Sequence, residues 1–304
     1  MYHDSRWLSL IARAAGNRAH IRGVFLEGHL VGGIPLQVRK RGPLSLARRA
    51  FATPYANPVF RDTLGGLSEN CAGTLFEDLA KSYSVVTVAG SPFAMLPGSL
   101  VEGWKLARRA TYVLDISDTD KLWARFGHQL RKKIQRAERR GIEIVSPCEP
   151  SVFFELYNHT FARQGLRTPM NREGFAGLLT ALTDMNLARS YLARTAEGAP
   201  VVARLVLFDE RRAYCALSGA DFSVIKGCTS ELLIWQIIQD FSETHSEMDL
   251  VGANIESISA FKRKFKGRLV QYQEATHFRS GFEKCLIRLY QRRKKSRSGV
   301  SAHE

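Results

Sequence analysis

Hydrophobic and polar positions change period several times along the chain, and this pattern predicts helices and short strands in alternation. Apolar residues recur at helical spacing near the start and at every second position in four further segments. The helix is predicted over 5–15, and the strands over 20–26, 30–38, 190–195 and 201–208. A Glu-Gly turn joins each pair of strands as a hairpin, at Glu27–Gly28 and at Glu197–Gly198. We therefore expect one structural unit used twice, with coincidence as the alternative.

A polar cluster at Ser117–Asp120 separates the two halves. It follows a stretch that contains Pro, Gly and Ser and a predicted strand over 110–116. Polar segments of this kind are typical of domain boundaries. The predicted domains are an N-terminal domain over 1–116, a C-terminal domain over 117–280, and a basic C-terminal helix and tail over 281–304.

One long helix is predicted after this boundary. It begins at an N-cap, Asp118 or Thr119, runs to Arg140 and stops at Gly141. One side of the helix is apolar and the opposite side carries arginine and lysine. The apolar stripe comprises Leu122, Trp123, Phe126, Leu130, Ile134 and Ala137. We expect the apolar side to pack and the other side to be cationic.

Helical and strand patterns continue to alternate through the second half. Helices are predicted over 151–163, 172–183 and 230–244, and strands over 142–145, 212–218 and 248–251. Helices that alternate with a mixed sheet favour a layered α/β (α+β) fold over a helical bundle or a β-sandwich. Each domain is expected to be a mixed, mostly antiparallel sheet flanked by helices.

The net charge of the chain indicates which kinds of partner it could bind. The 304 residues include 44 Lys and Arg against 29 Asp and Glu, a formal charge of +15. Such an excess suits tRNA, an anionic membrane or a nucleotide-linked substrate, and a soluble basic surface is the plain alternative. The five cysteines form no C-x-x-C pair, so we expect free thiols in a reducing cytosol and no metal site.

No apolar run reaches the ~18 residues of a membrane-spanning helix, and the charged N-terminus lacks the apolar core of a signal peptide. A cytoplasmic location is therefore expected. The last predicted helix leads into a basic run at Arg292–Arg297. This run is either a frayed tail or a peripheral contact to anionic lipid at the inner membrane face or to RNA phosphates.

Two segments of the second half carry a family resemblance. Asp249–Tyr272 (DLVGANIESISAFKRKFKGRLVQY) runs from a short strand through a Gly-Ala-Asn turn into a helix with Phe261-Lys262. Leu130–Val145 (LRKKIQRAERRGIEIV) sets a basic helix end before a Gly stop and a strand. Together they resemble the FemABX family of aminoacyl transferases and the related BioF2-like acetyltransferase domains. The resemblance implies tandem GNAT-like domains and acyl transfer to an amine.

Acyl transfer to an amine needs stabilisation of an oxyanion and a proton for the leaving group, but no side-chain nucleophile. The resemblance implies that Lys262, the lysine of the family's Phe-Lys pair, is catalytic, either at the oxyanion or at the donor's terminal phosphate. It also implies an oxyanion contact from a splayed central strand, which we place near 201–208. The family continues with Phe-Gly-Gly where this chain has Phe265-Lys266-Gly267. A surface lysine in a basic run is the alternative for Lys262.

Substrate contacts are predicted mainly on the same two segments. Arg131 matches an arginine that helps the peptidoglycan-bridge enzymes bind a phosphate-bearing acceptor, and a guanidinium can bind phosphate through two parallel hydrogen bonds. The other predicted substrate-binding residues are Lys132, Lys133, Asn254, Phe261 and Tyr214. The alternatives are a solvated helix surface for the lysines, turn formation for Asn254 and a structural role for Tyr214.

The donor is judged from the loop before the helix over 230–244. Acyl-CoA enzymes of this superfamily carry Q/R-x-x-G-x-G/A there, and its N–H groups hold the pyrophosphate at the helix start. This chain has VIKGCT over Val224–Thr229, which keeps the first glycine but lacks the leading and closing residues. Gly227, Thr229 and Arg263 form the predicted donor-binding set. With the basic charge, this loop favours aminoacyl-tRNA over acyl-CoA as the co-substrate, and no tightly bound cofactor is expected.

Three functions therefore stay open. The first is transfer from aminoacyl-tRNA to an amine of a cell-wall precursor or another phosphate-bearing or lipid-linked acceptor. The second is acyl-CoA-dependent acylation of an amino sugar or exopolysaccharide unit. The third is a non-catalytic module that binds nucleic acid or a membrane surface. It is disfavoured because aromatic residues do not interleave with the basic ones and no helix-turn-helix or zinc pattern is present.

Overall fold

The computed structural model describes residues 1–98, 103–224, 227–287 and 289, and the chain divides into two compact units. Unit 1 contains Met1 and Ala110–Val270, and unit 2 contains Tyr2–Arg109 and the chain from Gln271 onward. The chain passes from unit 2 to unit 1 within strand β6 (Lys105–Asp115) and returns within strand β12 (Arg268–Phe278). This division into two units does not test the domain limits predicted at 117 and 281, which stay predictions.

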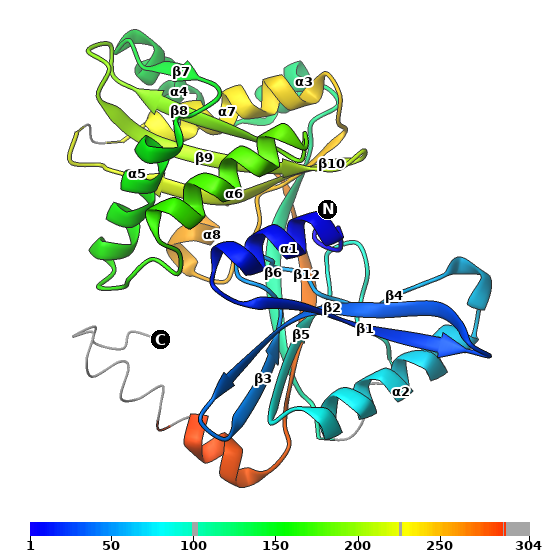
Figure 1. Ribbon diagram of the computed structural model, residues 1–304. Coiled ribbons are helices and arrows are strands. Elements are labelled where there is room, and N and C mark those ends of the chain that lie inside the picture. Colours follow the sequence, from blue (N-terminus) through cyan, green and yellow to red (C-terminus); the bar gives the residue numbers. More distant parts are fainter. Residues whose placement is uncertain (99–102, 225–226, 288, 290–304) are drawn as a thin grey trace. The chain divides into compact units, whose positions relative to one another are not determined.

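Unit 2 is a mixed sheet with one long helix on its face. Its elements are α1 (Ser5–Ala14), β1 (Arg18–Leu26), β2 (His29–Arg41), β3 (Leu44–Arg48), β4 (Val59–Phe60), a 3-10 turn (Asp62–Leu64), α2 (Leu67–Ser82) and β5 (Val85–Ala89). The strand order is β1-β2-β3-β5-β12, with β4 paired to β2. Helix α2, cyan in Figure 1, packs its buried leucines and phenylalanine against alternate residues of β2, β3 and β5.

The first predicted hairpin of unit 2 is confirmed. Strands β1 and β2 pair antiparallel from Arg18 to Leu26. The turn residues Glu27 and Gly28 both have positive φ, +51° and +80°. Two successive positive φ values are what a tight hairpin turn with right-handed strand twist requires, and glycine adopts them without strain.

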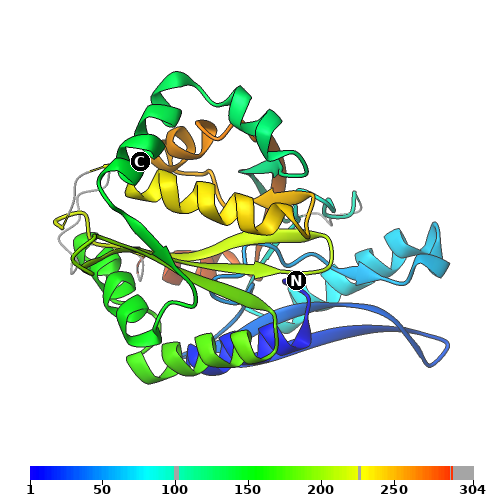
Figure 2. The same cartoon turned by 90° about the horizontal axis from the view of Figure 1, so that it is seen from above.

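Unit 1 contains a further set of paired strands, which helices cover on both faces. Its further elements are α3 (Thr119–Arg125), α4 (His128–Arg139), β7 (Glu143–Val145), α5 (Pro150–Arg163), α6 (Arg172–Asp184), β8 (Ala188–Arg194), β9 (Pro200–Phe208), β10 (Arg212–Ala220), α7 (Thr229–Ser242), β11 (Glu247–Asp249) and α8 (Glu256–Arg263). The strand order is β6-β11-β10-β9-β8-β7. Figures 1 and 2 show α5 and α6 on one face and α4 and α7 on the other. Because both faces are covered, β9 is apolar almost throughout.

The single helix predicted to end at Arg140 is wrong, because the chain forms α3 and α4 with a break between them. Phe126 and Gly127 are extended, with ψ of 135° and 151°. Phe126 is 1% exposed and packs edge-on against Trp235 and Phe265, and the break directs its ring into this cluster. The two ends were predicted correctly. The Asp118 carboxylate accepts from the N–H of Lys121 at 2.8 Å, and Gly141 has a φ of +67°.

A short parallel strand pair occurs in each unit. In unit 1, β10 pairs with β11 only over Arg212–Tyr214, and a bulge at Ala216 interrupts its pairing with β9. Strand β11 also pairs with β6, and after Asp249 the chain stays along β6, where Leu250 donates to the carbonyl of Tyr112 at 2.9 Å. In unit 2, β3 and β5 are likewise parallel over three residues around α2. Both units thus use the same strand–helix–strand device, as the predicted tandem fold requires.

The diverging strand of unit 1 is β10, and the expectation that placed it near 201–208 is wrong. That segment is β9, which pairs antiparallel on both sides, with β8 and with β10. A strand hydrogen-bonded on both edges has no backbone group left for a substrate. Periodicity could not separate the two strands, because both are short, apolar and adjacent in sequence.

The C-terminal segment is described only in part. Residues 281–287 are helical, and Ile287 packs on Leu46 and Val85. The basic run Arg292–Arg297 lies outside the described residues, so its predicted membrane or RNA contact stays a prediction. Within the described part of the chain, no helix combines the length and the apolar character that crossing a bilayer needs.

Candidate functional site

Lys262 holds the turn at which β11 ends. Its Nζ donates to the backbone carbonyls of Val251 and Gly252, each at 2.5 Å. Both acceptors have positive φ, +52° and +78°. A β-branched residue such as Val251 disfavours that conformation, so the turn needs support from its surroundings. The amine of α8 is therefore fixed where the chain leaves β10.

The surroundings of Lys262 favour the uncharged form of its amine. Burial lowers the pKa of Lys262 to about 8, and the positive charge of Arg204 adds to this effect while Cys215 and Asp249 oppose it. Burial also raises the pKa of the Cys215 thiol, against the positive charges of Arg204 and Lys262. At neutral pH the Lys262 amine is mainly protonated. It loses its proton near pH 8, where a lysine with the ordinary pKa of 10.5 is still protonated.

Arg204 is a cation in the middle of an apolar strand. It lies on β9 and is 9% exposed. Its Nε is buried and has no hydrogen-bond partner in the described part of the chain. A buried donor without a partner costs free energy unless a ligand or water satisfies it. Arg204 therefore adds a second cation, with hydrogen-bonding capacity left, to the surroundings of Lys262.

Asp249 stabilises the same turn from the opposite direction. Its carboxylate is 0% exposed and accepts from Thr111 Oγ1 at 2.6 Å and from the N–H of Val251 at 2.8 Å. Thr111 Oγ1 in turn accepts from the N–H of Gly252 at 3.2 Å. The turn is thus held through its N–H groups by Asp249 and Thr111, and through its carbonyls by Lys262. These bonds favour a structural role for Asp249.

The two segments that carry the resemblance meet at the start of α7. Glu231, in the first turn of α7, is 4% exposed. Its Oε1 lies 3.1 Å from Lys133 Nζ of α4 and 3.5 Å from Lys264 Nζ, which follows α8. Arg131 lies two residues before Lys133 and is half-buried, and its side chain forms no hydrogen bond or ion pair with the described residues. Lys132 is exposed, so only part of this basic helix end faces α7.

The remaining predicted substrate-binding residues have structural contacts. The Tyr214 hydroxyl donates to Asp209 at 3.0 Å, and burial together with Asp209 raises its pKa. The Asn254 side chain accepts from the N–H of Ala110 at 2.9 Å, which fits its alternative role in the turn. Phe261 packs edge-on against Phe265 at 5.6 Å. Substrate contacts for Tyr214, Asn254 and Phe261 stay predictions.

The loop before α7 is described from Gly227 onward, and Ile225 and Lys226 of the predicted motif lie outside the described residues. Gly227 and Cys228 both have positive φ, +75° and +67°. Thr229 is 1% exposed, and its Oγ1 is buried without a hydrogen-bond partner in the described chain. Arg263 is exposed. The buried carboxylate of Glu231 occupies the first turn of α7, where a diphosphate would otherwise meet the positive end of the helix dipole.

Sequence reasoning missed two residues of this site, Arg204 and Glu231. Each is the one charged residue within an apolar run, in PVVARLVLF of β9 and in ELLIW of α7. A charge inside an otherwise buried element is costly unless it is paired or used, and that pattern was the available signal.

Residues 124–263 match the family model described as an acetyltransferase (GNAT) domain. A comparison with curated proteins finds no match.

Three solved structures are similar over nearly the whole chain. FemX is 13% identical, with a TM-score of 0.64 over 94% of this chain and 93% of FemX. The C-terminal domain of an Agrobacterium fabrum protein assigned as a lysylphosphatidylglycerol synthetase is 14% identical, with a TM-score of 0.61 over 95% and 92%. A tandem GNAT protein from the clavulanic acid biosynthesis pathway is 15% identical, with a TM-score of 0.54 over 92% and 97%.

Proposed function

We propose that this chain, whose residues 124–263 match a GNAT acetyltransferase domain and whose fold is similar to that of FemX, is a FemABX-like N-acyltransferase that transfers an aminoacyl group from aminoacyl-tRNA to an amine. The proposed acceptor is a cell-wall precursor or another phosphate-bearing amine. One observation supports this assignment above the others. A lysine with a lowered pKa lies at the turn where β11 ends, and the positive charge of the buried Arg204 acts on it.

The proposed chemistry is direct transfer. The neutral acceptor amine attacks the ester carbonyl, a C–N bond forms, and the carbonyl oxygen becomes an oxyanion. The C–O bond to the tRNA ribose then breaks, and a proton from the attacking nitrogen passes to the leaving oxygen. The Lys262 ammonium has a third N–H beyond the two that bind Val251 and Gly252, and together with Arg204 it supplies positive charge for the oxyanion.

Two features favour an aminoacyl donor over acyl-CoA. The carboxylate of Glu231 lies in the first turn of α7, where it would repel a diphosphate bound at this helix end. One similar structure comes from a protein named for the synthesis of lysylphosphatidylglycerol, an aminoacylated product. In the proposal Arg131 contacts a phosphate of the substrate, while Lys133 is paired with Glu231.

The test offers the purified protein two donors, charged tRNA and acetyl-CoA, each with a mixed amine acceptor pool. We expect acceptor mass to rise by an aminoacyl residue with charged tRNA, and RNase treatment of that donor to abolish the gain. Removing one oxyanion contact typically costs about 10²-fold or more in rate, so Lys262→Met should lose activity on that scale. Lys121→Met, an exposed lysine of α3, is the matched control and should retain full activity.

Acyl-CoA-dependent acylation of an amino sugar is the second candidate. Its support is the description of the matched family as an acetyltransferase and the left-handed Gly227–Cys228 pair before α7. A mass gain of one acyl group with acetyl-CoA, insensitive to RNase, would replace the first proposal with this one. Binding of RNA or vesicles without product from either donor would instead favour the non-catalytic module.

A further inference from the structure

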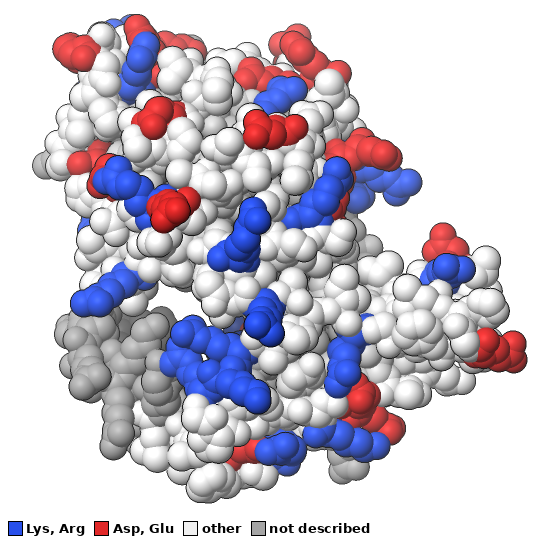
Figure 3. Space-filling model, viewed as in Figure 1, with Lys and Arg blue, Asp and Glu red and all other residues white. Residues whose placement is uncertain are grey.

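Unit 2 contains an arginine-lined hollow on the sheet face opposite α2. Its volume is about 880 Å³. Side chains alternate between the two faces of a strand, and β2 and β3 turn one set toward α2 and the other toward the hollow. The set toward the hollow comprises Gln37, Arg39, Arg41, Leu44, Leu46 and Arg48. Figure 3 shows Lys and Arg side chains gathered over β2 and β3.

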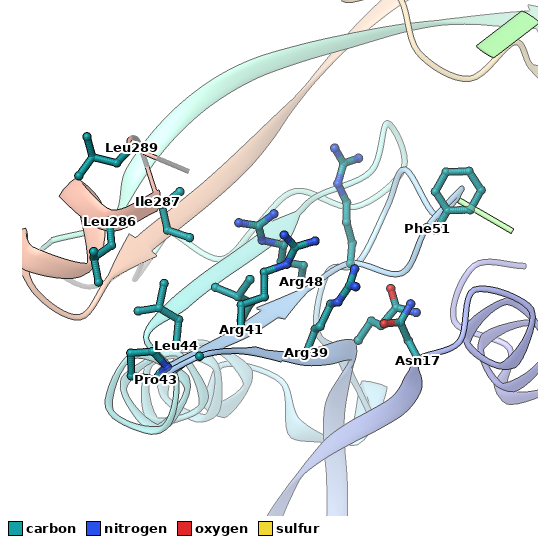
Figure 4. A pocket seen from close by; sticks show the side chains of 14 residues that line it. Asn17, Arg39, Arg41, Pro43, Leu44, Arg48, Phe51, Leu286, Ile287 and Leu289 are labelled. Atoms are coloured by element: carbon teal, nitrogen blue, oxygen red, sulfur yellow. The ribbon is translucent and has the colours of Figure 1, made fainter. Parts of the chain in front are cut away.

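Three of these arginines converge in one space. Figure 4 shows Arg39, Arg41 and Arg48 pointing the same way from neighbouring strands. Desolvation and the charge of Arg39 lower the pKa of Arg41, and desolvation and the charge of Arg41 lower that of Arg48. Arginine side chains are cationic at neutral pH, because the pKa of a guanidinium lies far above 7. Like charges held this close are stabilised when an anion binds between them.

The residues described as lining the hollow include no carboxylate. Arg49, at its margin, already pairs with Glu274 at 2.9 Å. Arg39 and Arg48 form no ion pair with a carboxylate in the described chain. Gln37 Nε2 is buried and has no hydrogen-bond partner among the described residues. The hollow therefore offers an amide donor as well as the charges of Arg39 and Arg48, which no described carboxylate pairs with.

One end of the hollow is apolar. Leu44 and Leu46 of β3 line this end together with Leu286 and Ile287, and Figure 4 shows Leu44, Leu286 and Ile287 at one end with the arginines in the middle. Ile287 packs on Leu46, which fixes this wall. A ligand that fills the hollow must therefore be charged in one part and hydrocarbon in another.

We propose that this hollow binds a phosphorylated amphiphile. A phosphate or diphosphate group lies among Arg39, Arg41 and Arg48 and accepts from Gln37, and a hydrocarbon chain lies along the leucine wall. The volume falls within the range of small-molecule sites. An RNA strand fits less well, because Phe51 is the one aromatic side chain among the described lining residues and stacked bases need several.

The binding test needs no catalysis and therefore stands apart from the proposed transferase activity. Calorimetry compares three soluble probes: dihexanoyl phosphatidic acid below its micelle concentration, dihexanoyl phosphatidylcholine and inorganic pyrophosphate. We expect phosphatidic acid to bind at least tenfold more tightly than either of the others, because it alone combines an uncompensated phosphate charge with hydrocarbon. A cosedimentation arm with phosphatidylcholine vesicles, with and without phosphatidic acid, separates a membrane lipid from a soluble amphiphile.

Two variants locate the site. Arg39→Gln/Arg48→Gln should weaken phosphatidic acid and pyrophosphate binding by about tenfold or more, since each charged hydrogen bond contributes on that scale. Leu44→Asn should weaken phosphatidic acid but leave pyrophosphate unchanged. Arg18→Gln removes an exposed arginine of β1 outside the lining and should change neither.

Three results would overturn the proposal. They are equal affinity for phosphatidic acid and phosphatidylcholine, unchanged binding in the double arginine variant, and tighter binding of a single-stranded RNA than of phosphatidic acid with the same arginine dependence. Circular dichroism of every variant checks that the fold is retained. A positive binding result would hold even if no transferase activity were found.

Discussion

Lys133 Nζ lies 3.1 Å from Oε1 of Glu231, so the middle of α4 is linked to the buried first turn of α7. Lys264 reaches the same oxygen at 3.5 Å from the chain that follows α8. Two basic segments far apart in sequence thus share one acidic partner. The Glu231 carboxylate therefore holds both lysine side chains near the start of α7.

Neutralising that carboxylate should destabilise unit 1. Glu231→Gln leaves Lys133 and Lys264 without a counter-charge. Because both lysines are partly exposed, we expect a loss of about 1–2 kcal/mol in the free energy of unfolding. Urea unfolding of Glu231→Gln beside Glu243→Gln, an exposed glutamate at the end of the same helix, measures it. Equal stability of the two variants would contradict a role for the shared contact.

The charge of Lys262 should set an alkaline limit on activity. Its pKa is lowered to about 8, so the ammonium is present below that pH and lost above it. Wild-type kcat/KM should therefore fall above about pH 8 relative to Lys262→Arg, which stays charged up to pH ~10. Initial rates from pH 6 to 10 give this ratio. A ratio that does not vary with pH would contradict the proposed role of Lys262 in stabilising the oxyanion.

The same lowered pKa has a consequence for stability that needs no activity assay. Lys262 has a pKa of about 8 when folded and an ordinary value of 10.5. Between these two values the unfolded chain binds more protons, so the free energy of unfolding should rise with pH in that window. Lys262→Met should lack this rise. Denaturant titrations at pH 7.5 and 10 of both proteins test the sign, and a wild-type fall larger than that of the variant would contradict it.

Arg204 should add to the effect of burial on the pKa of Lys262. Its positive charge contributes to lowering the pKa of Lys262. In Arg204→Met we expect the alkaline limit to move above pH 8 and the maximal rate to fall. Stability should not decline, because a buried donor without a partner is removed. The pH profile and thermal unfolding of this variant, with Arg211→Met on the exposed turn before β10 as control, separate charge from packing.

Two glycines of unit 1 should respond to alanine in opposite ways. A Cβ at Gly219 would lie 2.3 Å from the backbone N of Tyr157, so α5 would have to move off β10. A Cβ at Gly177, inside α6, meets nothing within 4 Å. We expect Gly219→Ala to lower the free energy of unfolding by several kcal/mol, of order 3, and Gly177→Ala to raise it by roughly 0.5–1 kcal/mol. Urea unfolding compares the pair.

Local pattern predicted most of the architecture of this chain. Alternation identified β8 and β9, capping residues identified Asp118 and Gly141, and the repeated Glu-Gly hairpins indicated the tandem fold. The break at Phe126 was not predictable in this way. Phe126 keeps the helical apolar stripe in register, and only packing against Trp235 and Phe265 ends the helix there.

The candidate site was predictable only for residues that belong to a local motif. Lys262 stands in a recognisable strand–turn–helix segment. Arg204 and Glu231 act through neighbours that are distant in sequence, since the partners of Glu231 lie on α4 and after α8. Pairing between distant elements also decides which strand diverges from its neighbour. The sequence alone therefore led us to expect the diverging strand at β9, whereas it is β10. Such relationships depend on register, which periodicity leaves undetermined.

The late return of the chain into unit 2 has a consequence for biosynthesis. β5 forms hydrogen bonds with residues 274–278 of β12, so the partner of an early strand leaves the ribosome after nearly all of unit 1 has been made. Until then this edge of β5 is open, and open strand edges are sites of association between chains. The nascent N-terminal part must therefore wait for its last strand while the later unit already has its whole sequence available, which reverses the usual order of folding during translation.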